Sequence, residues 1–243
     1  MSDSLIRCLS PREMLLSSNR FERFVFGYII PVLIMIGLTG NMLNFMVLLA
    51  QPMRKRTWLL SCLAVCDIFF LFFMLPHTLA HYELFTFNYT FRELYLSYKT
   101  HLLAFTNWAS AAAVWLILFI CFERLIGVRY PFLIRRYGID STVSRQALIL
   151  FVVMLTGFLT IYMHFSYVTV MKPFCNNTQI YAFHIPIGAT VWPGNRTNPS
   201  PYWLRELILW NTRIHELLVV FIPTIIIIIA NALLIITLKA RTK

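Results

Sequence analysis

Long uncharged apolar stretches alternate with short polar ones along this chain of 243 residues. Five of these stretches, one of which contains a single charge, reach the roughly 20 residues that an α-helix needs to cross about 30 Å of hydrocarbon. Helices are expected rather than strands, because every backbone amide in lipid must be paired within its own segment. The pattern predicts an all-α membrane protein, a transmembrane helix bundle with helices at residues 24–50, 58–81, 100–123, 146–169 and 214–238.

The composition supports this class and excludes others. Hydrophobic residues make up 59% of the chain, charged residues only 13%, and the mean hydropathy is +0.70. Soluble globular domains carry about 25% charged residues, so a soluble enzyme or a nucleic-acid-binding domain is not expected. The net charge of +11 is explained by basic cytoplasmic loops.

The distribution of basic residues predicts the orientation. If the N-terminus is outside, the three inside segments carry most of their charge as arginine and lysine, with only Glu123 and Asp140 as acids. The positive-inside rule therefore favours an N-terminus outside and a C-terminus inside. The inside basic residues are Arg54, Lys55, Arg56, Arg124, Arg129, Arg135, Arg136, Arg145, Lys239, Arg241 and Lys243.

Three Asn-x-Thr glycosylation acceptors, at Asn88, Asn176 and Asn195, fall on the outside in this orientation. Residues 1–23 contain no signal peptide with a cleavage site, so the first helix is expected to act as an uncleaved signal anchor. The expected organisation is an extracellular N-terminal segment, residues 1–23, followed by a transmembrane domain, residues 24–243. The expected location is the plasma membrane.

The longest outside segment, residues 167–213, is rich in Pro, Asn and Trp. Loops of this length are usually functional or disordered. Two interpretations carry equal weight: an exposed recognition surface, or a glycosylated spacer.

Polar residues inside the predicted helices are candidates for function. A carboxylate near a helix centre costs about 2.5 to 3.5 kcal/mol on insertion scales, so Asp67 should face the bundle interior and is expected to have a functional role. Asn41 and Asn44, three residues apart on the first helix, share a face and are expected mainly to bind neighbouring helices.

Several short motifs appear in a characteristic order on these helices: Gly40-Asn41, Leu63-Ala64-Val65-Cys66-Asp67, Pro76, Glu123-Arg124-Leu125, Pro131-Phe132 and Pro223. In this order and topology they resemble the rhodopsin-like (class A) G-protein-coupled receptors. Residues 63–82 and 107–131 look most like invertebrate neuropeptide receptors of the FMRFamide and myosuppressin type. The resemblance implies a receptor rather than an enzyme, with a peptide ligand, a heterotrimeric G protein as partner and no cofactor.

An activation switch would involve Asn41, Asp67, Glu123, Arg124 and Pro223. Arg124 can pair with an acid or a carbonyl in one state and face a cytoplasmic partner in another; the simpler interpretation is a helix-end anchor. Pro223 removes the helical hydrogen bond to the Val219 carbonyl.

A ligand pocket is expected between the outer ends of the second, third and fifth helices and the second outside loop. Polar and aromatic groups converging in an apolar cleft suit peptide recognition, although each taken alone is also typical of a membrane-interface residue. The candidates are His77, His81, Thr106, Asn107, Ser110, His215 and Glu216.

The chain also departs from the family pattern. The usual disulfide from the third helix is impossible because no cysteine lies between Cys66 and Cys121. Cys8 and Cys175 are both outside and form a possible pair, but sequence does not determine connectivity. Leu125 replaces the usual Tyr of the signature, the fourth helix lacks its typical Trp, and Asn231 stands at a usual Tyr.

The sequence ends after the fifth helix, at Lys243. We expect a receptor truncated before its sixth and seventh helices, which would not signal alone. A transporter or channel subunit is the alternative, but the chain lacks several intramembrane charges and Gly-rich broken helices. A membrane hydrolase is disfavoured because His77, His81, His164 and Asp67 form no catalytic arrangement.

Overall fold

The computed structural model describes residues 7–16, 19–50, 57–130, 142–194 and 196–241. The chain divides into two compact units. One, which we call the hairpin unit, comprises residues 1–38, 70–106 and 161–210; the other, the helical unit, comprises residues 39–69, 107–160 and 211–243.

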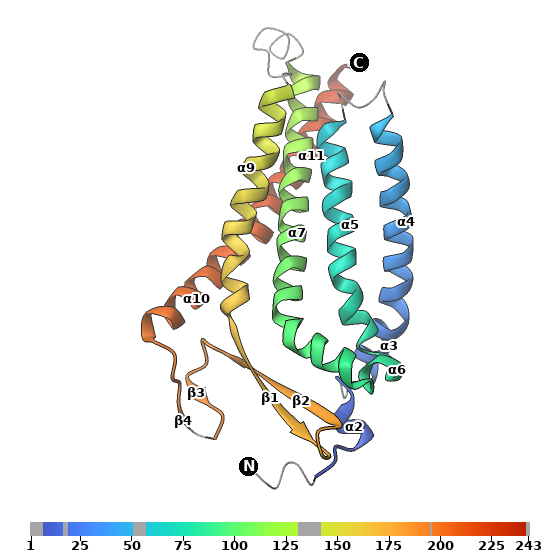
Figure 1. The fold of residues 1–243 in the computed structure, drawn as a ribbon. Helices are drawn as coiled ribbons and strands as arrows, with labels where there is room; N and C mark the ends of the chain where they lie inside the picture. The colour runs from blue at the N-terminus through green and yellow to red at the C-terminus, as the bar shows by residue number, and fades with distance from the viewer. Residues whose placement is uncertain (1–6, 17–18, 51–56, 131–141, 195, 242–243) are drawn as a thin grey trace. The chain divides into compact units, whose positions relative to one another are not determined.

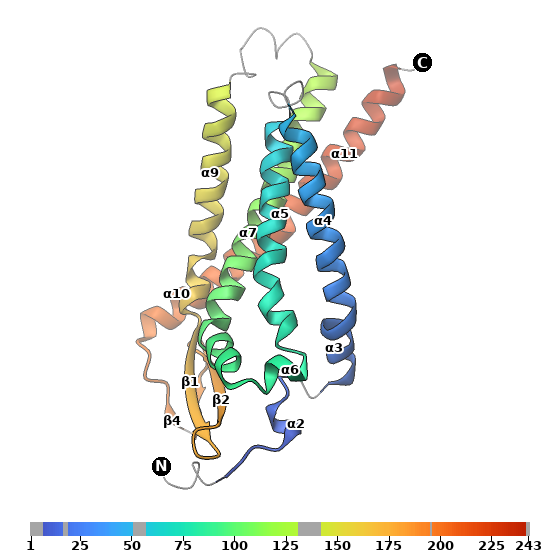
Figure 2. The ribbon, with the colours of Figure 1, turned by 45° about the vertical axis from the view of Figure 1, so that its right-hand side comes forward.

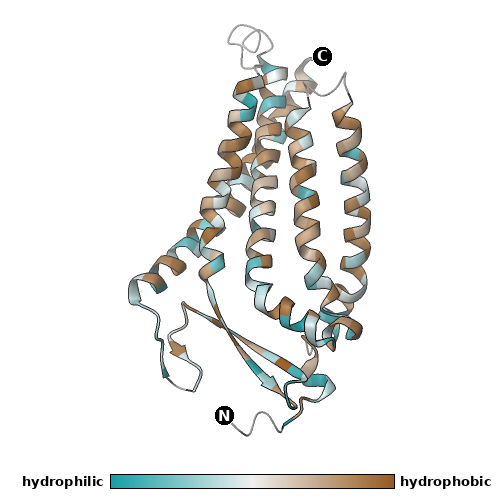
Figure 3. Ribbon diagram, in the orientation of Figure 1, coloured by the Kyte–Doolittle hydropathy of each residue, from teal (hydrophilic) through white to brown (hydrophobic). Residues whose placement is uncertain are grey.

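The described residues contain five helical runs long and apolar enough to cross a membrane, as the hydrophobic pattern predicts. The runs are Arg20–Leu49, Trp58–Leu79, Tyr89–Arg129, Val143–Phe165 and Tyr202–Ala240. Apolar residues cover most turns of α4, α5 and α9, whereas hydrophilic residues gather near the helix ends (Figure 3). The chain is therefore a helical membrane protein.

The first run combines α3 (Arg20–Phe24), the π-helical turn η1 (Val25–Ile29) and α4 (Ile30–Leu49). Pro31 has no amide hydrogen and cannot bind the Gly27 carbonyl in the usual helical manner. The helix forms a wider π turn before Pro31, in which the Ile30 amide donates to the Val25 carbonyl. The Gly27 carbonyl instead accepts a hydrogen bond from the Tyr82 hydroxyl, at 2.5 Å.

The second and third runs are α5 (Trp58–Leu79) and α7 (Tyr89–Arg129), joined by the short α6 (Glu83–Thr86). The helix expected at 100–123 is longer than predicted at both ends, because charged residues at its start, including Arg92, still belong to it. Asn88 precedes α7, and its side-chain oxygen accepts from the Phe91 amide, which caps the helix.

The fourth run, α9 (Thr142–Thr160) with the 3₁₀ turn η2 (Ile161–Phe165), ends earlier than expected. Residues 167–169 are not helical; they begin the antiparallel hairpin of β1 (Tyr167–Phe174) and β2 (Gln179–Pro186). The strand fits the alternation of Thr, Val and Met there. Figures 1 and 2 both show the hairpin beside α2 (Pro11–Met14).

The fifth run begins earlier than the expected residue 214. It consists of α10 (Tyr202–His215), the π-helical η3 (Glu216–Phe221) and α11 (Ile222–Arg241), and it follows the short pair β3 (Val191–Trp192) and β4 (Arg196–Thr197). The Ile222 amide donates to the Leu217 carbonyl, so a π turn again ends two residues before a proline, here Pro223. This is the local loosening expected where a proline removes a helical hydrogen bond.

Each unit has its own apolar core. In the hairpin unit, Ala80, Tyr95, Leu96 and Ile180 are buried together, and Ile208 of α10 packs with Tyr162 and Ile187.

In the helical unit the core consists of Leu59, Leu116 and Val152. Trp108 of α7 donates from its indole nitrogen to the Val153 carbonyl at 3.0 Å, and its ring lies against Gly157. A Cβ atom on Gly157 would lie 3.1 Å from that ring, so the glycine provides the space that α7 needs for its tryptophan. The indole comes from the third run, while the fourth has no tryptophan of its own.

Candidate functional site

Two candidate ligand residues, His77 and His81, lie together in an aromatic cluster of the hairpin unit. Phe26 stacks on His81 and meets His77 edge-on, each at a ring-centroid distance of 4.9 Å. His77 Nδ1 lies 2.5 Å from the Tyr95 hydroxyl. Helices α5 and α7 and the turn η1 thus each contribute to this cluster.

The hydrogen bonds of His77 and His81 show which ring nitrogens are already used within the protein and which are left for a ligand. His81 Nδ1 lies 2.8 Å from the carbonyl of His77. A carbonyl can only accept, so Nδ1 of His81 carries the hydrogen, and in the neutral ring Nε2 carries the lone pair. His77 likewise uses Nδ1 internally, so Nε2 is the ligand-facing candidate on both rings.

The other predicted ligand residues are not brought into this cluster. Thr106 is buried in the hairpin unit, and its hydroxyl donates to the Leu102 carbonyl of its own helix at 2.8 Å. Asn107, Ser110, His215 and Glu216 belong to the helical unit. There, Asn107 and Ser110 are half-buried, His215 is buried and Glu216 is exposed.

Arg92, which the sequence assigns to a loop, is the buried centre of the hairpin unit. The residue is only 3% exposed, and its guanidinium donates to three backbone carbonyls. The acceptors are Ile180 at 2.6 Å, Thr86 at 3.3 Å and Met14. A charged donor pairing with carbonyls offsets the free-energy cost of burying the guanidinium. One side chain therefore joins α7 to β2 and to the N-terminal segment.

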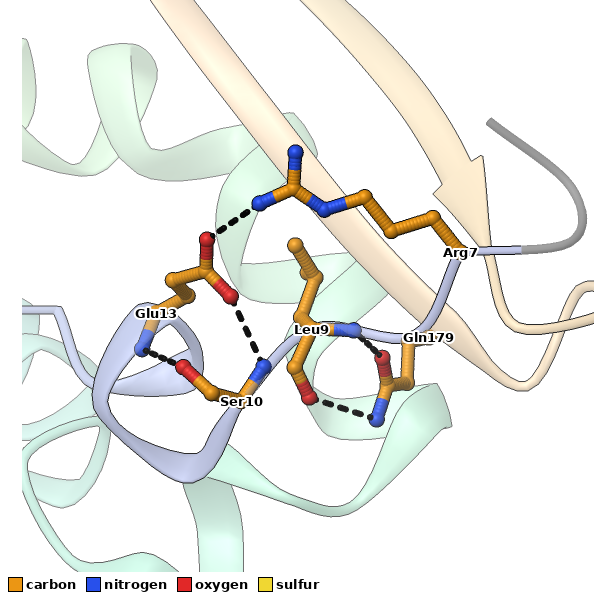
Figure 4. A network of polar contacts seen from close by, with 5 residues as sticks. All are labelled: Arg7, Leu9, Ser10, Glu13 and Gln179. Atoms are coloured by element: carbon orange, nitrogen blue, oxygen red, sulfur yellow. Dashed lines mark hydrogen bonds and ion pairs between the residues drawn. The ribbon is translucent and has the colours of Figure 1, made fainter. Parts of the chain in front are cut away.

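The N-terminal segment is also joined to the hairpin turn. A disulfide links Cys8 to Cys175, with a Cα–Cα distance of 4.3 Å, so the structure contains the pairing considered from the sequence. Gln179 exchanges two hydrogen bonds with the backbone of Leu9, at 2.6 and 3.4 Å (Figure 4). Ser10 caps α2 and forms a capping box with Glu13, whose carboxylate also pairs with Arg7 at 2.7 Å.

In the part of the chain that the structure describes, no strand pairs with the edge of β2 that faces away from β1, and β2 lines a groove. The Ile187 amide donates to the Ser166 carbonyl at 2.9 Å. This bond shows which residues of β2 direct their backbone N–H and C=O groups towards β1. Because antiparallel pairing alternates, the backbone groups of Ile180, Ala182 and His184 point away from β1. The Ile180 carbonyl accordingly accepts from Arg92 on that side. Pro173 of β1 and Pro186 of β2 each lack an amide on the outer edge of their strand, whereas Ala182 and His184 keep theirs on the outer edge of β2.

The groove beside β2 has a volume of about 580 Å³. Its lining includes the β2 residues Tyr181 to Pro186 and, across from them, Val191, Trp192 and Pro193. Phe183 is exposed and lies under the Lys172 ammonium, which is 5.3 Å from the ring centroid. An extended backbone edge with aromatic side chains is a surface that can receive an extended chain.

His184, within this groove, sits opposite Thr169 in the hairpin. Its Nδ1 lies 3.0 Å from the Thr169 hydroxyl, while Nε2 is buried with no hydrogen-bond partner among the described residues. Burial, and then the positive charge of Lys99, lower the pKa of His184 below its ordinary value. Both effects favour the neutral form of the imidazole.

The predicted switch residues lie in the helical unit. Glu123 pairs with Arg145 of α9 at 2.8 Å, whereas Arg124 is exposed. The ion pair at this helix end thus uses Arg145, a residue that the sequence assigned only to the basic loop. The downstream Pro131 and Phe132 lie outside the described residues.

The remaining polar candidates of that unit have mixed exposure. Asp67 and Asn41 are half-buried and Asn44 is exposed. Pro223 is buried directly after the π turn.

Two of the three glycosylation acceptors can be placed. Asn88 and Asn176 are both exposed in the hairpin unit, and Asn176 occupies the hairpin turn with a φ of 50°. Asn88 uses its oxygen as a helix cap, which leaves its amide nitrogen for a glycan. Asn195 lies outside the described residues.

Sequence reasoning missed Arg92, Tyr95 and His184 because none stands in a motif. The signal available for two of them was weak. Arg92 is a cation three residues before the aromatic Tyr95, and both residues belong to α7. The strand that begins at Tyr167 was not predicted, because the uncharged run through Thr169 to Met171 favoured a helix.

No family model matches the chain. A Caenorhabditis elegans protein named as a candidate G-protein-coupled receptor is 40% identical over 237 residues, covering 97% of this chain and 55% of that protein. A second candidate G-protein-coupled receptor of the same organism is 30% identical over 129 residues, covering 52% of this chain and 30% of its own length. The chain is thus similar over nearly all its residues to a protein of that name, and it spans about half of that protein's length.

Proposed function

We propose that this chain is the ligand-binding part of a rhodopsin-like G-protein-coupled receptor for an extracellular neuropeptide. The observation that carries the proposal is the 40% identity, over 97% of the chain, to a candidate G-protein-coupled receptor. The five membrane-spanning runs agree with the first five helices of such a receptor. The class A assignment rests on the motif order from Gly40-Asn41 to Pro223.

The proposed orientation has the N-terminus outside the plasma membrane. The disulfide between Cys8 and Cys175 supports this, since disulfides persist in oxidising compartments. The exposed acceptors Asn88 and Asn176 lie in the same unit. The hairpin unit then faces the ligand, and Arg124 faces a cytoplasmic G protein.

A peptide ligand is favoured by the edge of β2. The backbone groups of Ala182 and His184 offer main-chain hydrogen bonds to an extended peptide, and Trp192 and Phe183 offer side-chain contacts. The Nε2 atoms of His77 and His81 supply further polar groups of the same unit. A small ligand without an extended backbone could not form this series of main-chain hydrogen bonds.

The test is a screen of amidated peptides on cells that express the open reading frame containing this chain, with a calcium or cAMP readout. A peptide that activates these cells is then applied to two variants. Ala182→Pro removes an amide that points away from β1 and should weaken the response roughly tenfold, about 1.4 kcal/mol for one lost hydrogen bond. Ala182→Ser keeps the amide and should respond as the unaltered receptor does.

Surface expression of both variants is measured alongside. If no peptide activates the receptor while another class of ligand does, the peptide assignment is wrong. If the proline variant reaches the surface and responds normally, the ligand does not pair with β2.

A further inference from the structure

A second pair of histidines lies apart from the cluster described above. His101 of α7 and His164 of η2 are brought together with their Nδ1 atoms 2.9 Å apart. Their ring centroids are 5.2 Å apart and the rings are tilted by 31°. Both residues belong to the hairpin unit, and they are 63 positions apart in the sequence.

The surroundings hold the rings while leaving the pair accessible. Phe105, one turn after His101, meets the His164 ring edge-on at 5.0 Å. The ring centroid of Tyr98 lies 6.4 Å from that of His101. His101 is exposed and His164 is half-buried, so other side chains of the protein do not cover the pair completely.

The contact has a chemical consequence. Two Nδ1 atoms at hydrogen-bonding distance can share a single proton, one donating and the other accepting. Neutral imidazole is also the commonest protein ligand for zinc and related metals. Replacing the shared proton by a metal ion turns a single hydrogen bond into two coordinate bonds.

The distance is close to what a metal requires. With Zn–N bonds of about 2.0 to 2.1 Å in tetrahedral geometry, two ligand nitrogens lie about 3.3 Å apart. The observed 2.9 Å needs to open by a few tenths of an ångström, which a small rotation of the exposed His101 ring provides.

We propose that His101 and His164 form a two-histidine site for Zn²⁺, with water completing the coordination. Among the described residues no group of three or more His, Cys, Asp or Glu side chains is placed to hold a metal. The site is therefore open and reversible rather than a structural zinc site, which would have four protein ligands. The proposal does not depend on the receptor assignment.

The ion would connect α7 with the segment directly before β1. Because β1 begins at Tyr167, three residues after His164, bound zinc would restrain the base of the hairpin. A ligand that binds only the native state raises the apparent free energy of unfolding by RT ln(1 + [L]/Kd), so the stabilisation grows with the logarithm of the ligand concentration once that exceeds the dissociation constant.

The experiment uses the full chain in lipid nanodiscs, with ZnCl₂ as the probe and tryptophan fluorescence to follow thermal unfolding. Zinc is expected to raise the unfolding midpoint, and MgCl₂, a cation that prefers oxygen ligands, is expected to leave it unchanged. Calorimetric titration gives the affinity for zinc directly.

Two variants separate coordination from packing. His164→Gln retains a polar partner for His101 but loses one of the two coordinating imidazoles, so its zinc affinity should fall by at least roughly tenfold with little change in the metal-free midpoint. His101→Ala should lose zinc binding to the same extent. His184→Asn, a matched histidine change elsewhere in the same unit, should bind zinc as the unaltered chain does.

The proposal is overturned if zinc does not shift the midpoint of the unaltered chain. It is also overturned if His164→Gln binds zinc as tightly as the unaltered chain, because the metal then sits elsewhere. A zinc response lost in His184→Asn but kept in His101→Ala would assign the metal to the groove beside β2.

Discussion

At the scale of single residues, buried polar side chains carry the organisation of the hairpin unit. Arg92 donates to three carbonyls, Gln179 to the backbone of Leu9, and Tyr82 to the carbonyl that Pro31 leaves unpaired. Each satisfies a backbone group that regular secondary structure does not. The sequence offers no direct sign of these roles, because each depends on a carbonyl distant in the chain.

Replacing Arg92 by alanine should destabilise the hairpin unit by about 2 to 4 kcal/mol, because buried carbonyls lose a charged donor. Arg92→Lys should restore only part of this, since an ammonium cannot match the planar guanidinium geometry. The measurement is the thermal unfolding midpoint of the purified chain, together with its amount at the cell surface.

The control for Arg92 is Leu94→Ala, two residues along the same helix, where the side chain is 56% exposed. This change should leave the thermal unfolding midpoint almost unchanged. Equal midpoints for Arg92→Ala and Leu94→Ala would contradict a central role for the guanidinium.

His184 should make the stability of the hairpin depend on pH. Its pKa in the folded chain is lowered by burial and by Lys99. Unfolding raises the pKa to its ordinary value near 6.5, so the unfolded chain binds the proton more tightly. Stability is therefore full above about pH 6.5 and declines as the pH falls towards the lower folded pKa.

The measurement for His184 is the unfolding midpoint between pH 7.5 and 5.5 in the unaltered chain and in His184→Asn. The decline should be smaller in the asparagine variant, which has no group titrating in this range at that position. Parallel curves for the two proteins would show that His184 does not contribute.

At the scale of elements, the apolar runs predicted where the helices lie but not where they begin and end. Absence of charge locates the interior of a span. It does not exclude a charged residue whose charge is paired, so α7 begins at Tyr89, well before the expected start, and includes Arg92. Likewise α10 carries Arg205 and Glu206 within the run that continues into the fifth span.

The hairpin was the element that sequence reasoning did not predict. The uncharged run from Gln146 continues to Met171, and charge alone cannot distinguish its helical part from the strand that starts at Tyr167. The pairing partner, β2, lies beyond a turn of three residues with positive φ, Cys175 to Asn177. Whether such a run forms a strand depends on its cross-strand neighbours and its packing, which the run alone does not show.

The disulfide at this turn should matter for folding. Cys8→Ser and Cys175→Ser should each destabilise the chain by about 2 to 4 kcal/mol, and the double variant should be no worse than either, because one change already breaks the link. Mass spectrometry of non-reduced peptides checks the connectivity. Cys121→Ser, at a free thiol, is the control and should keep the linked peptide intact.

Detection of Cys8 linked to another cysteine would overturn this pairing. A single serine variant with unaltered stability would show that the link contributes nothing to the folded state.

At the scale of the whole molecule, the account requires five membrane crossings with a consistent sidedness. The spans follow from length and composition, and the positive-inside rule predicts that the segments rich in basic residues are cytoplasmic. The prediction of a peptide receptor depends on this orientation, because it exposes the hairpin unit to extracellular ligands. In the same orientation, Arg124 and the Glu123–Arg145 ion pair lie on the cytoplasmic side.

The most direct measurement is glycan mapping of the chain expressed in cells. Digestion with a peptide N-glycosidase should increase gel mobility, and Asn88→Gln, Asn176→Gln and Asn195→Gln should each remove one step of the shift. An Asn-x-Thr acceptor engineered into residues 51–56 should stay unmodified. A chain whose mobility does not change on digestion, or one glycosylated at the engineered acceptor, would contradict the proposed topology.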